Sequence, residues 1–558
     1  MNKPFVIRDP VHGYLDVAAH ERIVVDHPIT QRLRRVTQTG LAEFVFPEAR
    51  TSRFIHSLGA MHLASRFLIA AVENADEKTA LALFAELESL DVFNNYNVQL
   101  DDLELLLVPD RRFGGGGLGA TRVSFRDGSL RADRKFIRLL GLAEAGLRLA
   151  ALFHDLGHLP FSHDFEYALK DYASEDRPLA KELSSLAAGT PHERIGHRLA
   201  DLVFRGLIQN ERDIAPATRA SFAIARQILD MEPGYDDFPR PNVGALGWLH
   251  SLVDGEIDVD RADYLLRDAR ALGLEFAAYD LNRLIHNLVL VKHPTLGFIT
   301  AVDERGLTAV ESFYVSRARS HQVLVRHHKC AQLCASLRYA SVSALESEPG
   351  QQFLNELLAL EKTGDSKQAA ELLKQFAEHD DPWWLQVLRS VEGQNHDASE
   401  LLKATLQLIL RRQPTLKSLW KRKGDLSNAE ITKLNALLDS PERGASFQEA
   451  RRRLASQGVL LVLHRFRPYG VTLDGQVERN SIVMIQSADR LVPVVQLSPL
   501  IRSLRTGWDE DLHLHAFALK TSAITKEKVI RILLESDRAK QPATKSKLKK
   551  SDTQRAGH

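Results

Sequence analysis

The chain has 558 residues, enough for a large core and more than one domain, and 73 Lys and Arg nearly balance 72 Asp and Glu, for a formal net charge of +1. This balance creates no overall basic field and gives no reason to expect nucleic acid as the main partner. No signal peptide or apolar run of membrane-spanning length is evident, and the two cysteines, Cys330 and Cys334, lie one helical turn apart. We therefore expect a cytoplasmic protein without a membrane partner, whose thiols are buried and reduced.

The N-terminal segment predicts a hairpin followed by a helix. Turn residues and alternating polarity within residues 7–17 are typical of a short hairpin. Asp-His-Pro at residues 26–28 then predicts a helix cap, and the following helix would carry Gln31, Arg34 and Gln38 on one face. From the residues alone, that face is either solvated or a binding surface.

An apolar helix is predicted to begin at residue 53, with His56 in its first turn. Residues 76–140, which separate it from the next histidine motif, are interpreted as an insertion near the site or at an oligomer interface. The insertion contains an acidic helical stretch and four glycines at residues 114–117. No Lys-Ser/Thr follows these glycines, so a flexible linker is favoured over a phosphate-binding loop.

Residues 152–163, Leu-Phe-His-Asp-Leu-Gly-His-Leu-Pro-Phe-Ser-His, close a buried apolar helix. A core rarely buries His and Asp without partners, yet His154 and Asp155 are adjacent here, with His158 and His163 close behind. Neutral imidazole and ionised carboxylate both suit a divalent cation. The pair therefore predicts half of a metal-binding shell, and a solvated helix end is the alternative.

Further polar residues follow this motif. Glu166 lies three residues after His163, and His192 begins a new helix. On the next predicted helix, residues spaced by threes and fours share one face: Asp260, Tyr264, Arg267 and Asp268. Taken alone, that helix could equally present a surface of salt bridges.

The region after residue 280 mixes strands and helices. Residues 287–291 and 297–302 predict strands, and the helix over residues 311–319 carries Arg317 and Arg319. Amphipathic helices are then expected over 350–440. Strand-like segments follow at residues 459–466, 481–485 and 491–497. The basic, apolar-poor end of the chain predicts disorder over residues 536–558.

Together these motifs resemble the HD phosphohydrolase superfamily and, within it, the dNTP triphosphohydrolases, including dGTPase-like bacterial members. The motifs follow the family order: Asp-Pro-Val-His-Gly at 9–13, Gln-Arg-Leu-Arg at 31–34, Val-Phe-Pro at 45–47, Arg-Phe-Ile-His-Ser-Leu-Gly at 53–59, His-Asp-Leu-Gly-His at 154–158, Phe-Ser-His at 161–163, Asp-Val-Asp at 258–260 and Asp-Tyr at 263–264. They cover residues 1–70 and 145–330, and the rest resembles the family weakly.

The resemblance implies a mainly α fold, with an HD-domain helical core, small β-hairpins and a C-terminal α+β lobe. The expected divisions are an N-terminal arm with the first part of the core (1–75), the insertion (76–140), the HD catalytic core (141–345), the α+β lobe (346–535) and a disordered basic tail (536–558).

The resemblance also implies residue roles. The metal ligands would be His56, His154, Asp155 and Asp260. A catalytic cluster beside the metal would consist of His158, His163, Glu166 and His192, in which a carboxylate orients the imidazoles and raises the pKa of one for acid catalysis. Substrate contacts would come from Gln38, Arg53, Arg261, Tyr264, Asp268, Arg317 and Arg319. An activating nucleotide would bind at an allosteric site formed by Asp26, Gln31 and Arg34.

The implied reaction is metal-dependent hydrolysis of a dNTP to deoxynucleoside and triphosphate. The implied cofactor is a divalent ion: Mn, Mg, Fe or Zn. The implied partners are the dNTP, an activating nucleotide and further copies of the chain in a dimer or tetramer; nucleic acid is not indicated. Two alternatives stay open: an HD phosphohydrolase acting on another nucleotide or on nucleic acid, and a nucleotide-sensing scaffold without catalysis.

Overall fold

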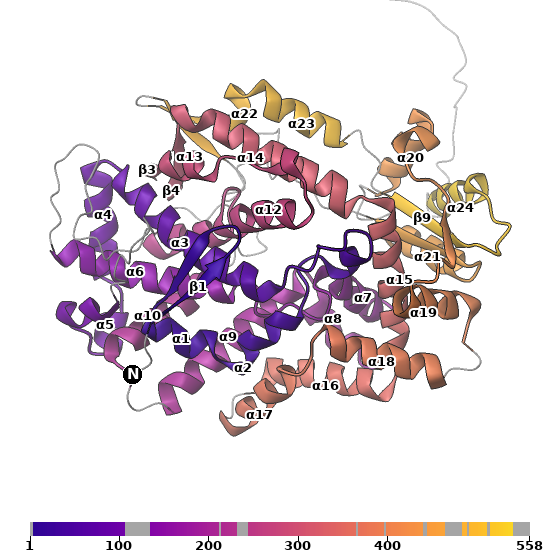
Figure 1. Cartoon of the computed structure of the whole chain (residues 1–558), viewed down its shortest axis with the longest axis horizontal. Coiled ribbons are helices and arrows are strands. Elements are labelled where there is room, and N and C mark those ends of the chain that lie inside the picture. The colour runs from indigo at the N-terminus through magenta and orange to yellow at the C-terminus, as the bar shows by residue number, and fades with distance from the viewer. Residues whose placement is uncertain are drawn as a thin grey trace, which may run out of the picture.

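Helices dominate the computed structural model, and the expected mainly α fold with small β elements is confirmed (Figure 1). The structure describes residues 4–106, 134–210, 214–230, 244–363, 366–394, 398–438, 444–463, 483–487, 490–509 and 514–538. The expected glycine loop at 114–117 and residues 539–558 of the expected tail lie outside the described residues.

The N-terminal hairpin is confirmed. Strands β1 (Phe5–Asp9) and β2 (Gly13–Val17) pair antiparallel, with Phe5 opposite Val17. Gly13 takes the left-handed φ of +83° that closes the turn. Two short helices follow, α1 (Ala19–Val25) and α2 (Pro28–Arg32).

The expectation of one helix carrying Gln31, Arg34 and Gln38 is wrong. Helix α2 ends at Arg32 and passes into a 3-10 turn, η1 (Leu33–Arg35). Beyond it the chain is extended, because the Gln38 amide donates to Thr51 O at 2.8 Å and the Arg53 amide to Val36 O at 2.9 Å. These long-range hydrogen bonds replace the local ones that a longer helix would have made.

The core is built around helix α3 (Arg53–Glu73), which packs against α6 (Arg134–Phe153) and α12 (Val259–Ala271). By length and composition α3 could cross a membrane, contrary to the expectation that no apolar run reaches that length, but 78% of its apolar window is buried inside the protein. Helix α10 (Pro216–Leu229) covers α6. The helix ends that carry the histidine motifs therefore emerge from a tightly packed apolar core.

The other helical elements of this half pack on this core or on one another. They are η2 (Gly40–Phe44), α4 (Glu77–Glu88), α5 (Val92–Asn95), η3 (Leu100–Leu106), α7 (His163–Ala173), α8 (Ala180–Ala187), α9 (Pro191–Asn210), α11 (Ala245–Val253), η4 (Glu275–Ala277), α13 (Leu281–His286), η5 (Glu304–Gly306), α14 (Leu307–Ser320), the π-helical turn η6 (His321–Val325) and α15 (His328–Ala344).

The C-terminal part contains helices and short strands, as expected. Its helices are α16 (Glu348–Lys362), α17 (Ser366–Phe376), α18 (Asp381–Gln394), α19 (Glu400–Arg411), η7 (Lys423–Asp425), α20 (Asn428–Leu438), α21 (Gly444–Ala455), α22 (Val494–Leu497), α23 (Pro499–Asp509) and α24 (Lys526–Arg538). Strands β5 (Leu416–Ser418), β6 (Val459–Leu463) and β9 (Leu514–Leu519) form one sheet in the order β5-β9-β6. In Figure 1 this sheet lies beside α20, α21 and α24 at one end of the molecule.

A second sheet crosses from the core to the C-terminal part. Its order is β3-β4-β7-β8, formed by β3 (Leu288–His293), β4 (Gly297–Asp303), β7 (Met484–Ser487) and β8 (Arg490–Pro493). The strand expected over 491–497 ends at Pro493, which has no N–H for the ladder, and the chain turns into α22.

Candidate active site

Four metal-ligand side chains converge where three core helices begin or end. His56 lies in the first turn of α3, His154 and Asp155 directly follow α6, and Asp260 lies in the first turn of α12. His56 Nε2 is 2.9 Å from Asp260 Oδ1 and 3.3 Å from Asp155 Oδ2. His154 Nε2 is 3.4 Å from Asp155 Oδ1 and 3.5 Å from Asp260 Oδ1. The sequence predicted all four residues, and the structure brings them together.

The orientation of both imidazoles fits a divalent cation. His154 Nδ1 lies 2.6 Å from Ala151 O, which can only accept, so this nitrogen carries the proton and Nε2 carries the lone pair. His56 Nδ1 lies 2.8 Å from Asp263 Oδ2, which fixes its ring in the same sense. Both Nε2 atoms are buried without a hydrogen bond of good geometry. His56, His154 and Asp260 offer ligand atoms that lie within 4.8 Å of one another, and Asp155 adds a carboxylate 3.3 Å from His56 Nε2 and 3.4 Å from His154 Nε2. These nitrogen and oxygen donors are of the kind that a divalent cation takes.

The electrostatics also favour a cation at this point. Burial alone would lower the pKa of His56, but its hydrogen bonds with Asp155, Asp260 and Asp263 outweigh burial and raise the pKa well above its ordinary value. Burial raises the pKa of Asp155, yet the charge of Arg53 outweighs burial and holds the pKa well below its ordinary range. At Asp260, hydrogen bonds with His154 and His56 outweigh burial and lower the pKa as well. Both carboxylates are therefore ionised and available as ligands.

A buried network behind His56 was missed by sequence reasoning. Asp263 accepts hydrogen bonds from Arg267 Nε and Nη2, both at 2.8 Å, and lies 2.7 Å from His12 Nε2. Arg267 Nη1 in turn donates to Asp9 Oδ2 at 2.7 Å. The N-terminal hairpin and α12 thus hold the carboxylate that orients His56.

Two signals in the sequence could have revealed this network. Asp263 and Arg267 are spaced four residues apart on one helix, and His12 belongs to the Asp-Pro-Val-His-Gly motif at residues 9–13. The contact is close: a Cβ built on Gly59 would lie 1.9 Å from Asp263 Oδ1, so only glycine lets α3 approach α12 here.

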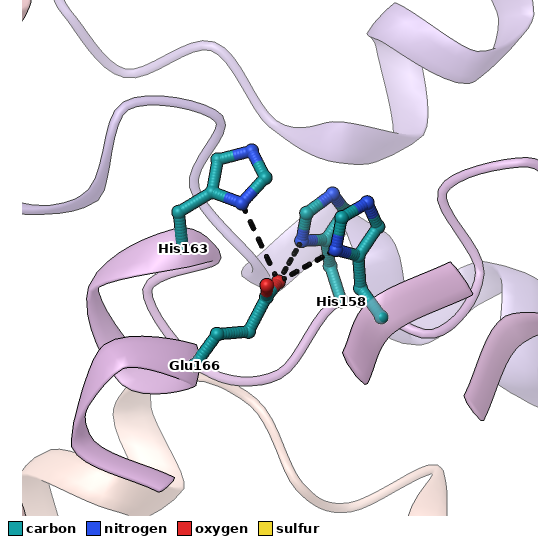
Figure 2. Close-up of side chains that lie close together, drawn as sticks. His158, His163 and Glu166 are labelled. Atoms are coloured by element: carbon teal, nitrogen blue, oxygen red, sulfur yellow. Dashed lines mark ion pairs between the residues drawn. The ribbon is translucent and has the colours of Figure 1, made fainter. Parts of the chain in front are cut away.

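A second cluster lies beside the first and is centred on one carboxylate. Figure 2 shows imidazole nitrogens directed at Glu166, which extends from α7. Glu166 Oε1 lies 3.2 Å from His158 Nδ1, 3.5 Å from His163 Nδ1 and 3.0 Å from His192 Nδ1. The His163 side chain is 56% exposed, whereas Glu166 is 5% and His192 13% exposed. His163 is therefore the member of the cluster that a substrate can reach.

Two histidines of this cluster differ in pKa because they face different charges. Burial lowers the pKa of His192, but the charge of Glu166 outweighs burial and raises it to about 9. Burial and the charge of Arg53 lower the pKa of His158 to about 3. At neutral pH His192 thus carries a proton and His158 does not.

The ring geometry suits protons better than a second metal. Although the four side chains could supply metal ligands, the His158 and His192 rings are stacked, with centroids 4.2 Å apart and planes 10° apart. Imidazole lone pairs lie in the ring plane, so those of two parallel rings cannot converge on one ion. In the first cluster the His56 and His154 planes cross at 78°, which allows convergence.

Asp155 joins the two clusters. Its Oδ1 lies 3.0 Å from His158 Nε2, while its Oδ2 accepts a hydrogen bond from Arg53 Nη1 at 2.7 Å. Arg53 Nε also donates to Ser162 Oγ at 3.0 Å. Asp155 and Arg53 therefore connect the first cluster to the residues that precede His163.

The residues expected to bind substrate surround this centre, with one exception. Tyr264 lies edge-on to His56, with ring centroids 6.5 Å apart, and the charges of Arg317 and Arg261 act on its hydroxyl. Arg317 is 2% exposed and donates to Glu256 Oε1 at 2.8 Å, and Arg261 contacts Asp258. Arg319 is instead exposed on α14, which leaves Arg317 as the inward-facing arginine of that helix.

Two further expected substrate residues offer buried polar atoms. Burial raises the pKa of Asp268 to about 7, and its Oδ1 has no hydrogen-bond partner. The buried Oε1 of Gln38 also lacks a partner. Buried polar atoms are normally paired, so both are candidates to meet a ligand.

The expected allosteric residues lie on one continuous stretch of surface. Asp26 pairs with Arg22 at 3.1 Å, and Gln31 Oε1 accepts from Arg34 Nε at 2.7 Å. The Arg34 guanidinium lies 3.7 Å from the centroid of the Phe54 ring. Because Phe54 is adjacent to Arg53, this surface is one residue away from a group that contacts Asp155.

Comparisons with known proteins agree with the motif order. No protein-family model matches the chain. Protein MJ1154 of Methanocaldococcus jannaschii is 25% identical over 323 residues, which cover 58% of this chain and 46% of that protein. The deoxynucleoside triphosphate triphosphohydrolase SAMHD1 of Bos taurus is 25% identical over 285 residues, which cover 50% of this chain and 37% of that protein. The chain thus spans about half or less of the length of these curated relatives.

Solved structures agree in fold. A phosphohydrolase from Bacteroides thetaiotaomicron has a TM-score of 0.51 at 18% identity, covering 92% of this chain and all of the other. A protein from Aquifex aeolicus has the same TM-score at 20% identity and covers 96% of this chain. Sequence and fold together confirm the resemblance and relate this chain to the HD-domain, dNTPase-like proteins.

Proposed function

We propose that this protein is a metal-dependent dNTP triphosphohydrolase, which cleaves a dNTP to deoxynucleoside and inorganic triphosphate. One observation carries the proposal: a metal-ligand cluster and an imidazole cluster with one exposed histidine share the carboxylate of Asp155. This arrangement pairs a site for a cation with an adjacent proton donor. The likeness to proteins named deoxynucleoside triphosphate triphosphohydrolase supports the choice of substrate.

The first cluster would hold the cation. His56, His154, Asp155 and Asp260 would supply two nitrogen and two carboxylate ligands. A divalent ion held there would lower the pKa of water and polarise the phosphorus that is attacked. Attack at the α-phosphorus expels the intact deoxynucleoside from the triphosphate.

His163 would donate the proton to the departing 5′ oxygen. Its Nδ1 faces Glu166 at 3.5 Å, so its other nitrogen is directed away from the cluster and, with the side chain 56% exposed, can reach substrate. Glu166 is ionised because the charges of His192 and His163 outweigh the effect of burial and hold its pKa well below its ordinary value. A carboxylate in this position orients the His163 ring for proton transfer to the leaving group.

The charge of the triphosphate requires fixed cations. Arg53, Arg261 and Arg317 fit this role, since each is held in place by a carboxylate: Asp155, Asp258 and Glu256 respectively. Guanidinium groups fixed before the substrate arrives stabilise developing charge without reorganising.

Recognition of the sugar would fall to Tyr264 and Gln38. The Tyr264 ring offers a flat wall beside His56, and the unpaired Oε1 of Gln38 can accept from the 3′-hydroxyl. Thr39 stands next to Gln38 and donates to Ala49 O at 3.3 Å. Its hydroxyl can still accept from a 2′-hydroxyl, so we propose that the preference for deoxyribose is incomplete.

We further propose that a nucleotide bound at Asp26, Gln31 and Arg34 activates a dimer or tetramer of this chain. The route is short, because Arg34 stacks on Phe54 and Phe54 adjoins Arg53, which contacts Asp155. A ligand that repositions Arg34 therefore acts close to the metal site, and by reciprocity it must bind the active assembly more tightly.

The test is a product analysis of all eight NTPs and dNTPs, with Mn²⁺, with Mg²⁺ and with a chelator. We expect deoxynucleoside plus triphosphate, formed only with added metal. Release of dNMP plus pyrophosphate, or of dNDP plus phosphate, would show that the reaction class is wrong. An absence of turnover on every nucleotide would favour a nucleotide-sensing scaffold instead.

A further inference from the structure

The turn that leads into His163 has an unusual backbone. Phe161 and Ser162 take φ values of 59° and 57°, two successive left-handed conformations in residues that have a Cβ. Such conformations are disfavoured and persist only where surrounding contacts enforce them. They decide the direction in which α7 begins, and therefore where the His163 side chain stands.

The contact that enforces this turn comes from a distant part of the chain. Asp381, the first residue of α18, is 5% exposed, and its Oδ1 accepts the Phe161 amide at 2.6 Å. Its Oδ2 accepts both the amide of Thr37 at 2.9 Å and the Thr37 hydroxyl at 2.7 Å. Three donors thus converge on the two oxygens of one carboxylate.

The same carboxylate is connected to the metal ligands. Thr37 O accepts from Ser162 Oγ at 2.6 Å, and Ser162 Oγ accepts from Arg53 Nε at 3.0 Å. Arg53 in turn donates to Asp155 Oδ2 at 2.7 Å. An unbroken path of short hydrogen bonds therefore runs from Asp381 to the residue that both clusters share.

We propose that Asp381 is a positioning residue for the reaction: its carboxylate fixes the turn at Phe161 and Ser162 and so places His163. This inference rests on the proposed function, because it assigns His163 the role of acid. Only a carboxylate satisfies the geometry, since an amide has one accepting oxygen and its NH₂ would face a donor. The residue touches no reacting atom and acts through the backbone.

The neighbouring Asp380 supplies a matched control. It is also buried, at 4% exposed, and immediately precedes the same helix. Its oxygens instead accept from the Trp383 amide at 3.0 Å and from the Arg35 side chain, which is 53% exposed. Asp380 thus caps the start of α18 and does not contact the turn before His163.

The experiment compares Asp381→Asn, Asp380→Asn and Thr37→Val, each alone and in a His163→Ala background. Hydrogen exchange of the peptide over residues 156–166 reports on the turn without requiring activity. We expect faster exchange in Asp381→Asn, a smaller increase in Thr37→Val, which loses only the hydroxyl, and no change in Asp380→Asn. If exchange in Asp381→Asn equals that of wild type, the turn does not depend on Asp381 and the proposal fails.

Kinetics test the positioning itself. In Asp381→Asn we expect kcat to fall about 10- to 100-fold with KM within about twofold, as for a misplaced catalytic group. In the His163→Ala background the same change should lower kcat by less than about twofold, because the group that it positions is absent. Equal losses in both backgrounds would indicate general damage and would overturn the proposal.

Thermal unfolding of each variant keeps the two kinds of failure apart. If Asp381→Asn does not fold, Thr37→Val carries the same kinetic comparison. If wild type turns over no nucleotide, the proposed function and the role of Asp381 in the reaction both fail, and the exchange data still decide whether Asp381 holds the turn.

Discussion

Two clusters of histidines and carboxylates lie side by side in this protein, and they are built differently from the same residue types. In the first, each imidazole has an acceptor behind Nδ1, namely Asp263 or Ala151 O, so that both Nε2 atoms face a common point. In the second, the Nδ1 atoms all face the single carboxylate of Glu166. The atom behind each ring therefore decides whether the ring offers a lone pair or shares a proton.

The two clusters also differ in ring orientation and in charge. Crossed rings suit a shared ion in the first, and stacked rings exclude one in the second. Glu166 raises the pKa of His192 to about 9, so that His192 is protonated at neutral pH beside the first cluster. The comparison teaches that the first cluster has the geometry of a cation site and the second that of a proton-transfer site, with Asp155 as their common member.

The largest expected effect is the loss of metal from the first cluster. Asp260→Ala removes one of two carboxylate ligands, and we expect loss of both bound metal and turnover. The side chain is 31% exposed, so the variant should fold. Metal analysis and an activity assay measure the result, with Asp176→Ala, at an exposed position outside the site, as control. A fully active Asp260→Ala protein would contradict the assignment of Asp260 as a metal ligand.

The second expected effect comes from a substitution that removes the proposed proton donor and leaves the metal ligands in place. His163→Ala should lower kcat by about 10²- to 10⁴-fold, the usual contribution of a general acid. Metal content should stay at the wild-type value, because His163 contributes nothing to the first cluster. His293→Ala, at the end of β3, is the control. Loss of metal from His163→Ala would mean that the division between the clusters is incorrect.

A smaller effect tests the support behind His56. Asp263→Asn leaves all four metal ligands in place but removes the charge that orients His56 and pairs with Arg267. We expect metal affinity to fall about 10- to 100-fold. Titration of the metal-free protein measures it, with the exposed helix cap Asp280→Asn as control. An affinity within twofold of wild type would show that the network is not needed for metal binding.

The smallest effect concerns stability and pH. The pKa of His192 is raised in the folded state to about 9 from an ordinary value of 6.5. Its pairing with Glu166 therefore stabilises the fold fully below pH 6.5, and this contribution is lost as pH rises through about 9. The difference in free energy of unfolding between wild type and His192→Gln should shrink over that interval. Denaturant melts at several pH values test this, and a difference that grows with pH would contradict it.

The candidate metal ligands could be named from the sequence because the His154-Asp155 pair is local and the family resemblance supplied His56 and Asp260. His154 and Asp155 are adjacent, and His56 and Asp260 each begin a helix with clear apolar periodicity. What it missed depends on contacts between distant segments. Asp263 meets His12 from 251 positions away, and Asp381 meets Phe161 from 220 positions away. A local pattern can indicate the members of such pairs, as for Asp263 and Arg267, but not which distant residue each one meets.

The errors in secondary structure have two different origins. Residues after Arg32 have helical spacing, but the backbone of Val36 and Gln38 bonds to the segment at 51–53 instead. The apolar run at 491–497 has the composition of a strand, yet it leaves the sheet at Pro493. In the first place tertiary hydrogen bonds outweighed local preference, and in the second a proline ended the strand earlier than its composition predicts.

The most direct test of the central claim is the number of divalent ions that one chain binds. Metal-free protein would be titrated with Mn²⁺ and with Zn²⁺, and the stoichiometry read by calorimetry and by elemental analysis after gel filtration. The account predicts one ion per chain, absent from Asp260→Ala and retained in His192→Gln. Two ions per chain, with the second lost in His192→Gln, would contradict the division between a metal site and a proton site.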